Sequence, residues 1–170
     1  KQLMEKVQNI YTNNAENGLV AVCNAFNEML KCINQAMLSP DVCLSAKFLL
    51  HSGQSPDNSY EYAMLLKQIR WQCAAGFYPA YDNWKCIQNT YKSRGDTLLK
   101  CIESFRAHAK GAPADEKCNY AKSGKSCYQK PFYETCPGVM AVANYGCESF
   151  RQYAMAEYPQ CTDYCEVHPI

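Results

Sequence analysis

Cysteine is the residue type in this sequence with the most evident chemistry. The 170-residue chain has twelve cysteines, a density near that of small secreted disulfide-rich domains. No two of them are separated by only two residues, so the cysteine pairs of zinc ribbons and thioredoxin-like motifs are missing. We therefore expect six disulfides, no metal and no cofactor. The twelve residues are Cys23, Cys32, Cys43, Cys73, Cys86, Cys101, Cys118, Cys127, Cys136, Cys147, Cys161 and Cys165.

Helix geometry limits which cysteines can pair. Cys23 and Cys32 lie nine residues apart on one predicted helix, which puts them on opposite faces and about 13 Å apart along the axis. A disulfide needs Cα atoms within about 7 Å, so we predict that these two do not pair. A turn before Pro40 instead favours a bridge between Cys32 and Cys43.

A helix break predicted at residues 93–96 suggests another pair. Cys86 and Cys101 lie at similar distances on either side of it, and an antiparallel helical hairpin would bring them level. We predict that Cys86 pairs with Cys101.

The tip of this predicted hairpin carries the tripeptide Arg94-Gly95-Asp96. A guanidinium and a carboxylate separated by one glycine can bridge an integrin cleft, and an exposed tip between two helices would display them. A structural role explains the same residues, because Gly95 suits a turn and Asp96 suits the N-cap of the next helix. Both interpretations stay open at this point.

Aromatic residues suggest a second kind of contact. The segment 76–84 contains Phe77, Tyr78, Tyr81 and Trp84, and tyrosine-rich irregular segments are typical of contact surfaces. The alternative is that these rings cover the core between short helices. An apolar ligand cavity is a further hypothesis, for which the helical stripes offer Phe26, Met29, Leu30, Leu65, Leu66 and Ile69.

Several catalytic templates are excluded. His51, His108 and His168 show no spacing that predicts convergence on a metal or a catalytic group. The chain has no Cys-Cys pair of the phospholipase A2 type. Gly124-Lys125-Ser126 resembles the end of a phosphate-binding loop, but Asn119 stands where that motif needs its first glycine. We expect a protein that is not an enzyme.

Apolar residues recur three and four positions apart along most of the chain, which indicates helices rather than strands. We expect one all-α domain over residues 1–170, an irregular bundle of about six to eight helices, with a subdivision near residue 80 as the alternative. The expected helices cover about 19–38, the residues after Pro40, 60–75, 84–91, 97–108, two short pieces around Cys118 and Cys127 separated at Gly124, and 137–153. Residues 51–59, 76–83 and 111–115 are expected to be loops, and the tail from Pro159 to be extended.

Composition bears on compartment and partners. The net charge is +1, with both signs interspersed, so no nucleic-acid partner is expected. No run of about eighteen apolar residues occurs, and no membrane span is expected. The chain begins at Lys1, which suggests a mature form from which a signal peptide has been removed. We expect a secreted, extracellular protein.

The cysteine spacing Cys118-x8-Cys127-x8-Cys136, followed by a helix with Ser149-Phe150-Arg151, resembles a large family of secreted nematode domains, known as domain of unknown function nineteen. The upstream run Leu66-x2-Ile69-x3-Cys73 is similar to the middle of that family. A related invertebrate family of helical cysteine-rich proteins is the alternative. The resemblance implies secretion and a disulfide-linked helical fold, and it assigns no catalytic residue.

These observations predict a secreted helical binding protein that acts through contacts with an extracellular protein or an apolar small molecule. Self-association in a structural extracellular assembly is one alternative. An integrin-binding protein is another.

Overall fold

The computed structural model describes residues 2–14 and 17–166, and every regular element in these residues is a helix. The described helices are α1 (Gln2–Asn13), α2 (Gly18–Gln35), α3 (Pro40–Cys43), α4 (Ala46–His51), α5 (Pro56–Gln72), α6 (Phe77–Asp82), α7 (Trp84–Gly111), α8 (Lys117–Thr135) and α9 (Met140–Met155). The predicted all-α class is confirmed. The described residues form nine helices rather than six to eight, partly because α3, α4 and α6 are helices of only four to six residues.

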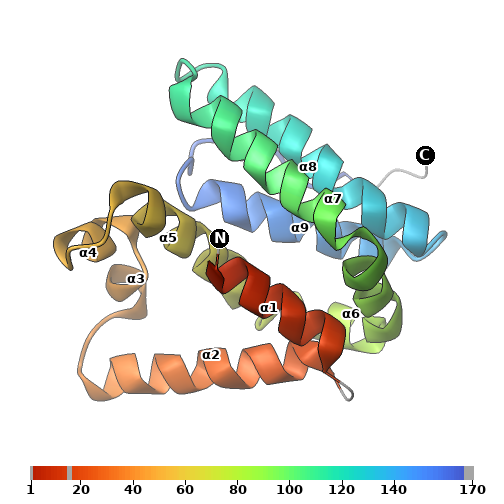
Figure 1. The fold of residues 1–170 in the computed structure, drawn as a ribbon, viewed down its shortest axis with the longest axis horizontal. Helices are drawn as coiled ribbons and strands as arrows, with labels where there is room; N and C mark the ends of the chain where they lie inside the picture. Colours follow the sequence, from red (N-terminus) through yellow and green to blue (C-terminus); the bar gives the residue numbers. More distant parts are fainter. Residues whose placement is uncertain (1, 15–16, 167–170) are drawn as a thin grey trace.

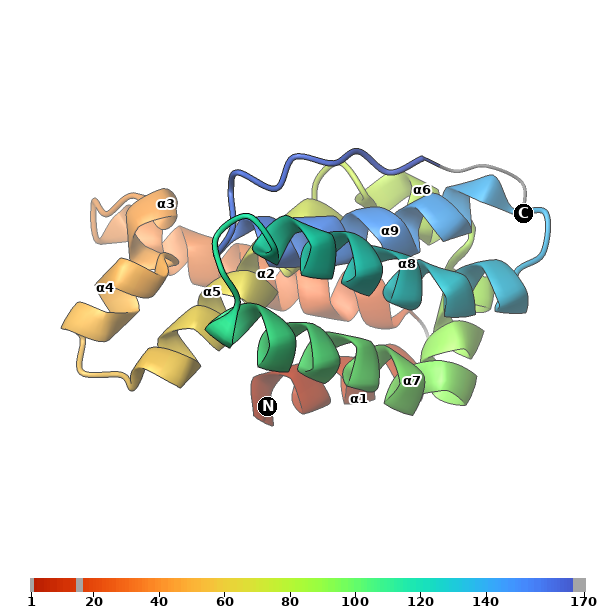
Figure 2. The ribbon, with the colours of Figure 1, turned by 90° about the horizontal axis from the view of Figure 1, so that it is seen from above.

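The long helices α7, α8 and α9 form the body of the protein (Figure 1). Short connections make them antiparallel neighbours, with α8 packed against both of the others. α5 packs against α9, and α1 packs against both α2 and α7. α3 and α4 form one end of the molecule in both ribbon views (Figures 1 and 2).

Two reciprocal notches bring α8 and α9 close together. Gly124 of α8 faces Phe150 of α9, and a Cβ atom added at Gly124 would lie 2.3 Å from Cζ of that ring. Gly146 of α9 faces Phe132 of α8 in the same way, with a distance of 2.5 Å to Cδ2. Both phenylalanines are almost fully buried. α8 runs without a break through Gly124, so the expected separation into two pieces is wrong.

Buried polar side chains connect α1, α5 and α9. The Tyr11 hydroxyl donates to Oε1 of Gln72 at 2.8 Å, and Nε2 of Gln72 donates to Oγ of Ser149 at 3.0 Å. All three side chains are buried, and a buried polar group is costly unless it is hydrogen-bonded. This chain of hydrogen bonds therefore fixes the positions of the three helices relative to one another.

Five disulfides form rather than the six expected. They are Cys23–Cys73, Cys86–Cys136, Cys101–Cys127, Cys118–Cys161 and Cys147–Cys165. The prediction that Cys23 and Cys32 do not pair is confirmed. The predicted Cys32–Cys43 bridge is wrong, because Cys32 is exposed on α2 whereas Cys43 is buried, and both are free thiols. The last two bridges hold the irregular tail.

The predicted Cys86–Cys101 bridge is also wrong, and the reason is the length of α7. This helix continues without a break through residues 93–96. Cys86 and Cys101 are therefore about 22 Å apart along one axis, too far for a disulfide. Cys86 pairs instead with Cys136, the C-cap of α8, and Cys101 pairs with Cys127 in the middle of α8.

Within the expected loop 76–83, residues 77–82 form the helix α6. Pro79 lies in the first turn of α6, where the missing backbone N–H costs no helical hydrogen bond. No helix in the described part of the chain is both long enough and apolar enough to cross a lipid bilayer.

Candidate functional site

An apolar groove lies between α3 and α4 on one side and α5 and the end of α9 on the other. We call it the α3–α5 groove. Its volume is about 520 Å³, within the range of about 300–1,000 Å³ that is usual for small-molecule sites. Its lining residues are Pro40, Asp41, Leu44, Ser45, Ala46, Ala63, Leu66, Lys67, Arg70, Trp71, Ala74, Ala75, Gln152 and Ala156.

Short side chains create the hollow. Five of the lining residues are alanines, contributed by α4, α5, the turn after α5 and the end of α9. Leu44, Leu66 and Trp71 supply larger apolar walls, and all three are partly buried. The groove therefore offers an apolar surface with space above it, the arrangement that buries an apolar ligand.

The outer wall of the groove is the segment of residues 37–53, which contains α3 and α4. We call it the α3–α4 segment. Ser45 separates the two short helices, because its Oγ accepts a hydrogen bond from the Phe48 N–H at 3.2 Å and donates to the Val42 carbonyl at 2.7 Å. This explains why one expected helix after Pro40 is two helices in the structure.

The α3–α4 segment has no covalent link to the body within its own length. Met37 at φ 56° and Gly53 at φ 85° mark its ends, and its one cysteine, Cys43, is unpaired. An ion pair between Asp41 of α3 and Arg70 of α5 connects it to the opposite wall, with both side chains largely exposed. Exposed ion pairs stabilise little, so this wall is held mainly by packing against α5.

The same segment concentrates exposed apolar side chains. Of the ten large hydrophobic residues that are exposed in the described chain, five lie between residues 37 and 50. Met37 is 95% exposed and Val42 is 57% exposed. The other three are Leu38, Phe48 and Leu50.

Arg94, Gly95 and Asp96 lie in the middle of α7 instead of at a hairpin tip. Arg94 and Asp96 are exposed, and Gly95 packs against the Gln8 side chain of α1. Both sequence interpretations placed these residues at a turn, and that placement is wrong. The integrin hypothesis stays a prediction, without the exposed loop on which it was based.

The four aromatic residues proposed as a contact surface separate into two groups. Tyr78 and Tyr81 are 74% and 50% exposed, and Phe77 stacks on Tyr81 with ring centroids 5.7 Å apart. Trp84 is buried in the core, where its ring lies 5.3 Å from that of Tyr11. The surface therefore consists of three of the proposed residues.

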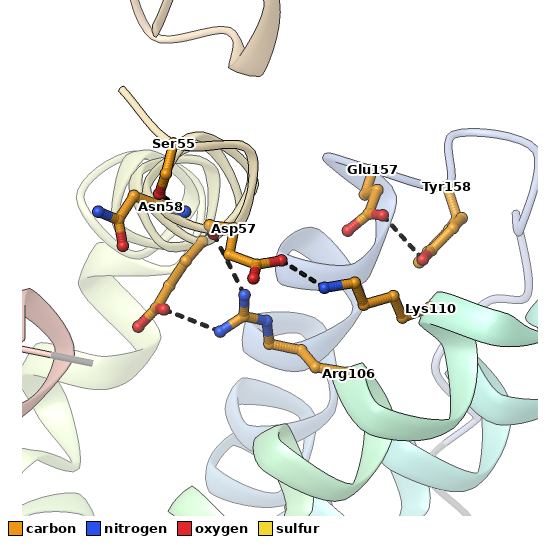
Figure 3. Close-up of polar contacts among 8 residues, drawn as sticks. Ser55, Asp57, Asn58, Arg106, Lys110, Glu157 and Tyr158 are labelled. Carbon is orange, nitrogen blue, oxygen red and sulfur yellow. Dashed lines mark hydrogen bonds and ion pairs between the residues drawn. The ribbon is translucent and has the colours of Figure 1, made fainter. Parts of the chain in front are cut away.

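The densest polar cluster in Figure 3 joins α5 to α7. Arg106 donates to Glu61 Oε2 at 2.8 Å and to the Asp57 carbonyl at 3.2 Å, and Lys110 donates to Asp57 Oδ1 at 2.6 Å. The hydrogen bond and charge of Lys110 lower the pKa of Asp57. Each carboxylate is matched by a cation, which is the pattern of a structural ion-pair network.

At the edge of the same view, the Tyr158 hydroxyl donates to Glu157 Oε1 at 2.8 Å (Figure 3). Burial raises the pKa of Tyr158, and the neighbouring Glu157 raises it further. The phenol therefore stays protonated at neutral pH and acts as a hydrogen-bond donor.

The histidines lie on different elements. His51 ends α4, and His108 near the end of α7 has its Nδ1 2.6 Å from the Ser104 carbonyl oxygen and stacks on Tyr120. His168 lies outside the described residues. Within those residues, no group of three or more histidine, cysteine, aspartate or glutamate side chains could hold a metal ion.

Comparison of the chain with protein-family models, with curated proteins and with solved structures finds no match. The resemblance to the nematode family therefore depends on the cysteine spacing and a few other identities, and it stays a prediction.

Of the six residues named from sequence as candidates for an apolar cavity, only Leu66 lines the α3–α5 groove. Phe26, Leu65 and Ile69 are buried in the core, and Met29 and Leu30 pack against it. Sequence reasoning missed the alanines of the groove, because alanine suits any helix position and carries no signal for a hollow.

Proposed function

We propose that the protein is a secreted, non-catalytic binding protein that holds a small apolar ligand in the α3–α5 groove. The observation that carries this proposal is the groove itself, a hollow of about 520 Å³ with alanines from several elements along its walls. Moving an apolar ligand from water onto such a surface lowers the free energy of the system.

Two other hollows fit a small apolar ligand less well. The cavity beneath α1 is lined mainly by apolar and aromatic residues, with Gln68 and Gln72 among them, and its volume is only about 30 Å³. It has room for about two water molecules. The hollow between α1 and α7 is lined mainly by polar residues, among them Gln8, Asn9 and Arg94. The α3–α5 groove combines sufficient volume with apolar walls.

Five disulfides support the extracellular part of the proposal. Disulfides form and persist in oxidising compartments, and they are rare where thiols are kept reduced. Two of them join α7 to α8 or to its C-cap, one joins α2 to the end of α5, and two hold the tail on α8 and α9.

Tryptophan fluorescence provides a direct test. The chain has two tryptophans, of which Trp71 lines the groove and Trp84 is buried in the core. Bromine quenches tryptophan on contact, so titration with 12-bromododecanol should quench Trp71 saturably. A Trp71→Phe variant should lose this quenching.

Filling the groove should then abolish binding. A phenylalanine in place of Ala74 or of Ala156 would fill part of the groove. We expect each variant to bind 12-bromododecanol at least tenfold more weakly than the wild type. Ala107→Phe, on the exposed surface of α7, is the matched control and should bind like the wild type. Saturable quenching that both folded groove variants retain would refute the proposal.

Self-association is a second candidate, because the α3–α4 segment lies at one end of the molecule (Figure 2). The side chains of Met37, Val42 and Phe48 in this segment are exposed. Contiguous exposed apolar surface is typical of protein interfaces. Light scattering after size-exclusion chromatography distinguishes the two functions, since a ligand-binding monomer keeps a mass of 19.3 kDa.

A further inference from the structure

The charges that line the α3–α5 groove do not balance. Three lining residues are charged, namely Asp41, Lys67 and Arg70. Asp41 and Arg70 neutralise each other through their ion pair. Lys67 has no ion-pair or hydrogen-bond partner among the described residues, and its side chain is exposed. The rim of an apolar groove therefore carries one uncompensated positive charge.

Lys67 is placed to contact a ligand in the groove. On α5 it lies four residues after Ala63 and four before Trp71, so the three residues share one face of the helix. All three line the groove. The aliphatic stem of a lysine can cover an apolar surface while its ammonium group stays in water. A ligand whose chain lies against Ala63 and Trp71 would thus bring its head group to the Lys67 ammonium.

We propose that the ligand is a single-chain amphiphile with an anionic head group, a proposal that depends on the binding function given above. The chain lies along the alanines of the groove, and the head group pairs with Lys67. A carboxylate or a phosphate supplies the same charge and the same acceptor oxygens.

Other head groups fit the rim less well. A cationic head would be repelled by Lys67, and the acid that could attract it, Asp41, is already bound to Arg70. A neutral head could accept a hydrogen bond from Lys67 but would form no ion pair with it. Because Lys67 is exposed, its contribution is that of a surface ion pair, about a two- to fivefold gain in affinity.

Two quenchers that differ only in their head group test the inference. At neutral pH and low salt, 12-bromododecanoate should bind about two- to fivefold more tightly than 12-bromododecanol. Lys67→Gln should remove this difference and leave the affinity of the alcohol unchanged. Lys100→Gln makes the same change in net charge on the exposed surface of α7 and should keep the difference.

Competition with dodecyl phosphate distinguishes the two anions. Displacement of the bromo acid that depends on Lys67 supports the inference, and the stronger competitor, phosphate or carboxylate, identifies the preferred head group. Equal binding of acid and alcohol, or a preference that survives Lys67→Gln, would refute the inference while leaving the binding function intact. Absence of saturable quenching by either bromo compound would refute the binding function itself, and the inference with it.

Discussion

Alanine at Gly95 and at Gly146 should change stability in opposite directions. Both glycines lie inside helices, in α7 and α9. Replacing glycine by alanine in a helix interior stabilises the folded protein by about 0.8–1 kcal/mol, because alanine loses less backbone freedom on folding. What the new Cβ atom contacts decides whether this gain survives.

At Gly95 the new atom would lie 2.6 Å from Nε2 of Gln8, the end of a flexible side chain that is partly exposed. Gln8 can rotate away at little cost. We therefore expect Gly95→Ala to stabilise the protein by about 0.5–1 kcal/mol, which raises Tm by about 1–4 °C for a chain of this size.

At Gly146 the new atom would lie 2.5, 2.9 and 3.2 Å from Cδ2, Cγ and Cβ of Phe132. This ring is fully buried, and its centroid lies 5.5 Å from that of Tyr91 and 5.7 Å from that of Tyr145. The base of the ring cannot move without separating α8 from α9. Overpacking a buried site costs up to about 3 kcal/mol, and we take a value near this upper end. Alanine recovers about 1 kcal/mol as the better helix former. The free energy of unfolding should therefore fall by about 2 kcal/mol.

Thermal unfolding under non-reducing conditions, followed by circular dichroism, measures both changes. Gly146→Ala should lower Tm by about 4–8 °C, and adding Phe132→Leu should recover part of that loss, since a smaller side chain relieves the contact. Destabilisation by Gly95→Ala would refute the reasoning, because it would show that residue 95 needs the backbone of a turn and that α7 is interrupted there.

Two further predictions concern thiols and phenols. In the native protein a maleimide should label the exposed Cys32 quickly and the buried Cys43 slowly, and two thiols should react after denaturation; a fully oxidised protein would contradict this. Burial raises the pKa of six tyrosines above the ordinary value of 10, so the stability that they confer is complete below pH 10 and is lost as the pH rises above it. These residues are Tyr11, Tyr91, Tyr128, Tyr145, Tyr153 and Tyr158. Their phenolate absorbance should appear together with alkaline unfolding, and titration of all thirteen tyrosines near pH 10 in a folded protein would contradict the burial.

Helical periodicity predicted the fold class, but a single glycine gave the wrong topology for α7. A glycine inside a helix lowers its stability by only about 1 kcal/mol. The packing and the disulfides on either side of Gly95 stabilise α7 by more than that. Cys86 and Cys101 bind α7 to α8 before and after Gly95. The continuity of the helix thus depends on contacts between residues far apart in the sequence.

The groove could not be predicted from the sequence, because it too depends on residues that are far apart in the chain. Its walls come from residues 40–46, 63–75 and 152–156, and its shape depends on how far α3 and α4 stand from α5. Leu66 follows the same helical spacing as the core residues of α5. It is part of a groove only because Leu44 and Ala156, from other segments, line the same hollow. The unpaired charge of Lys67 likewise becomes visible once Arg70 is seen to bind Asp41.

The disulfides divide the chain into two covalent units. Cys23–Cys73 closes the first unit, and the other four bridges overlap to close a second unit over residues 86–165. All twelve cysteines lie in the described residues, so no bridge crosses residues 74–85. A protease cut inside either unit leaves one connected molecule. A cut in α6, beside the exposed Tyr78, would instead yield two chains held together by contacts such as that between Gln72 and Ser149.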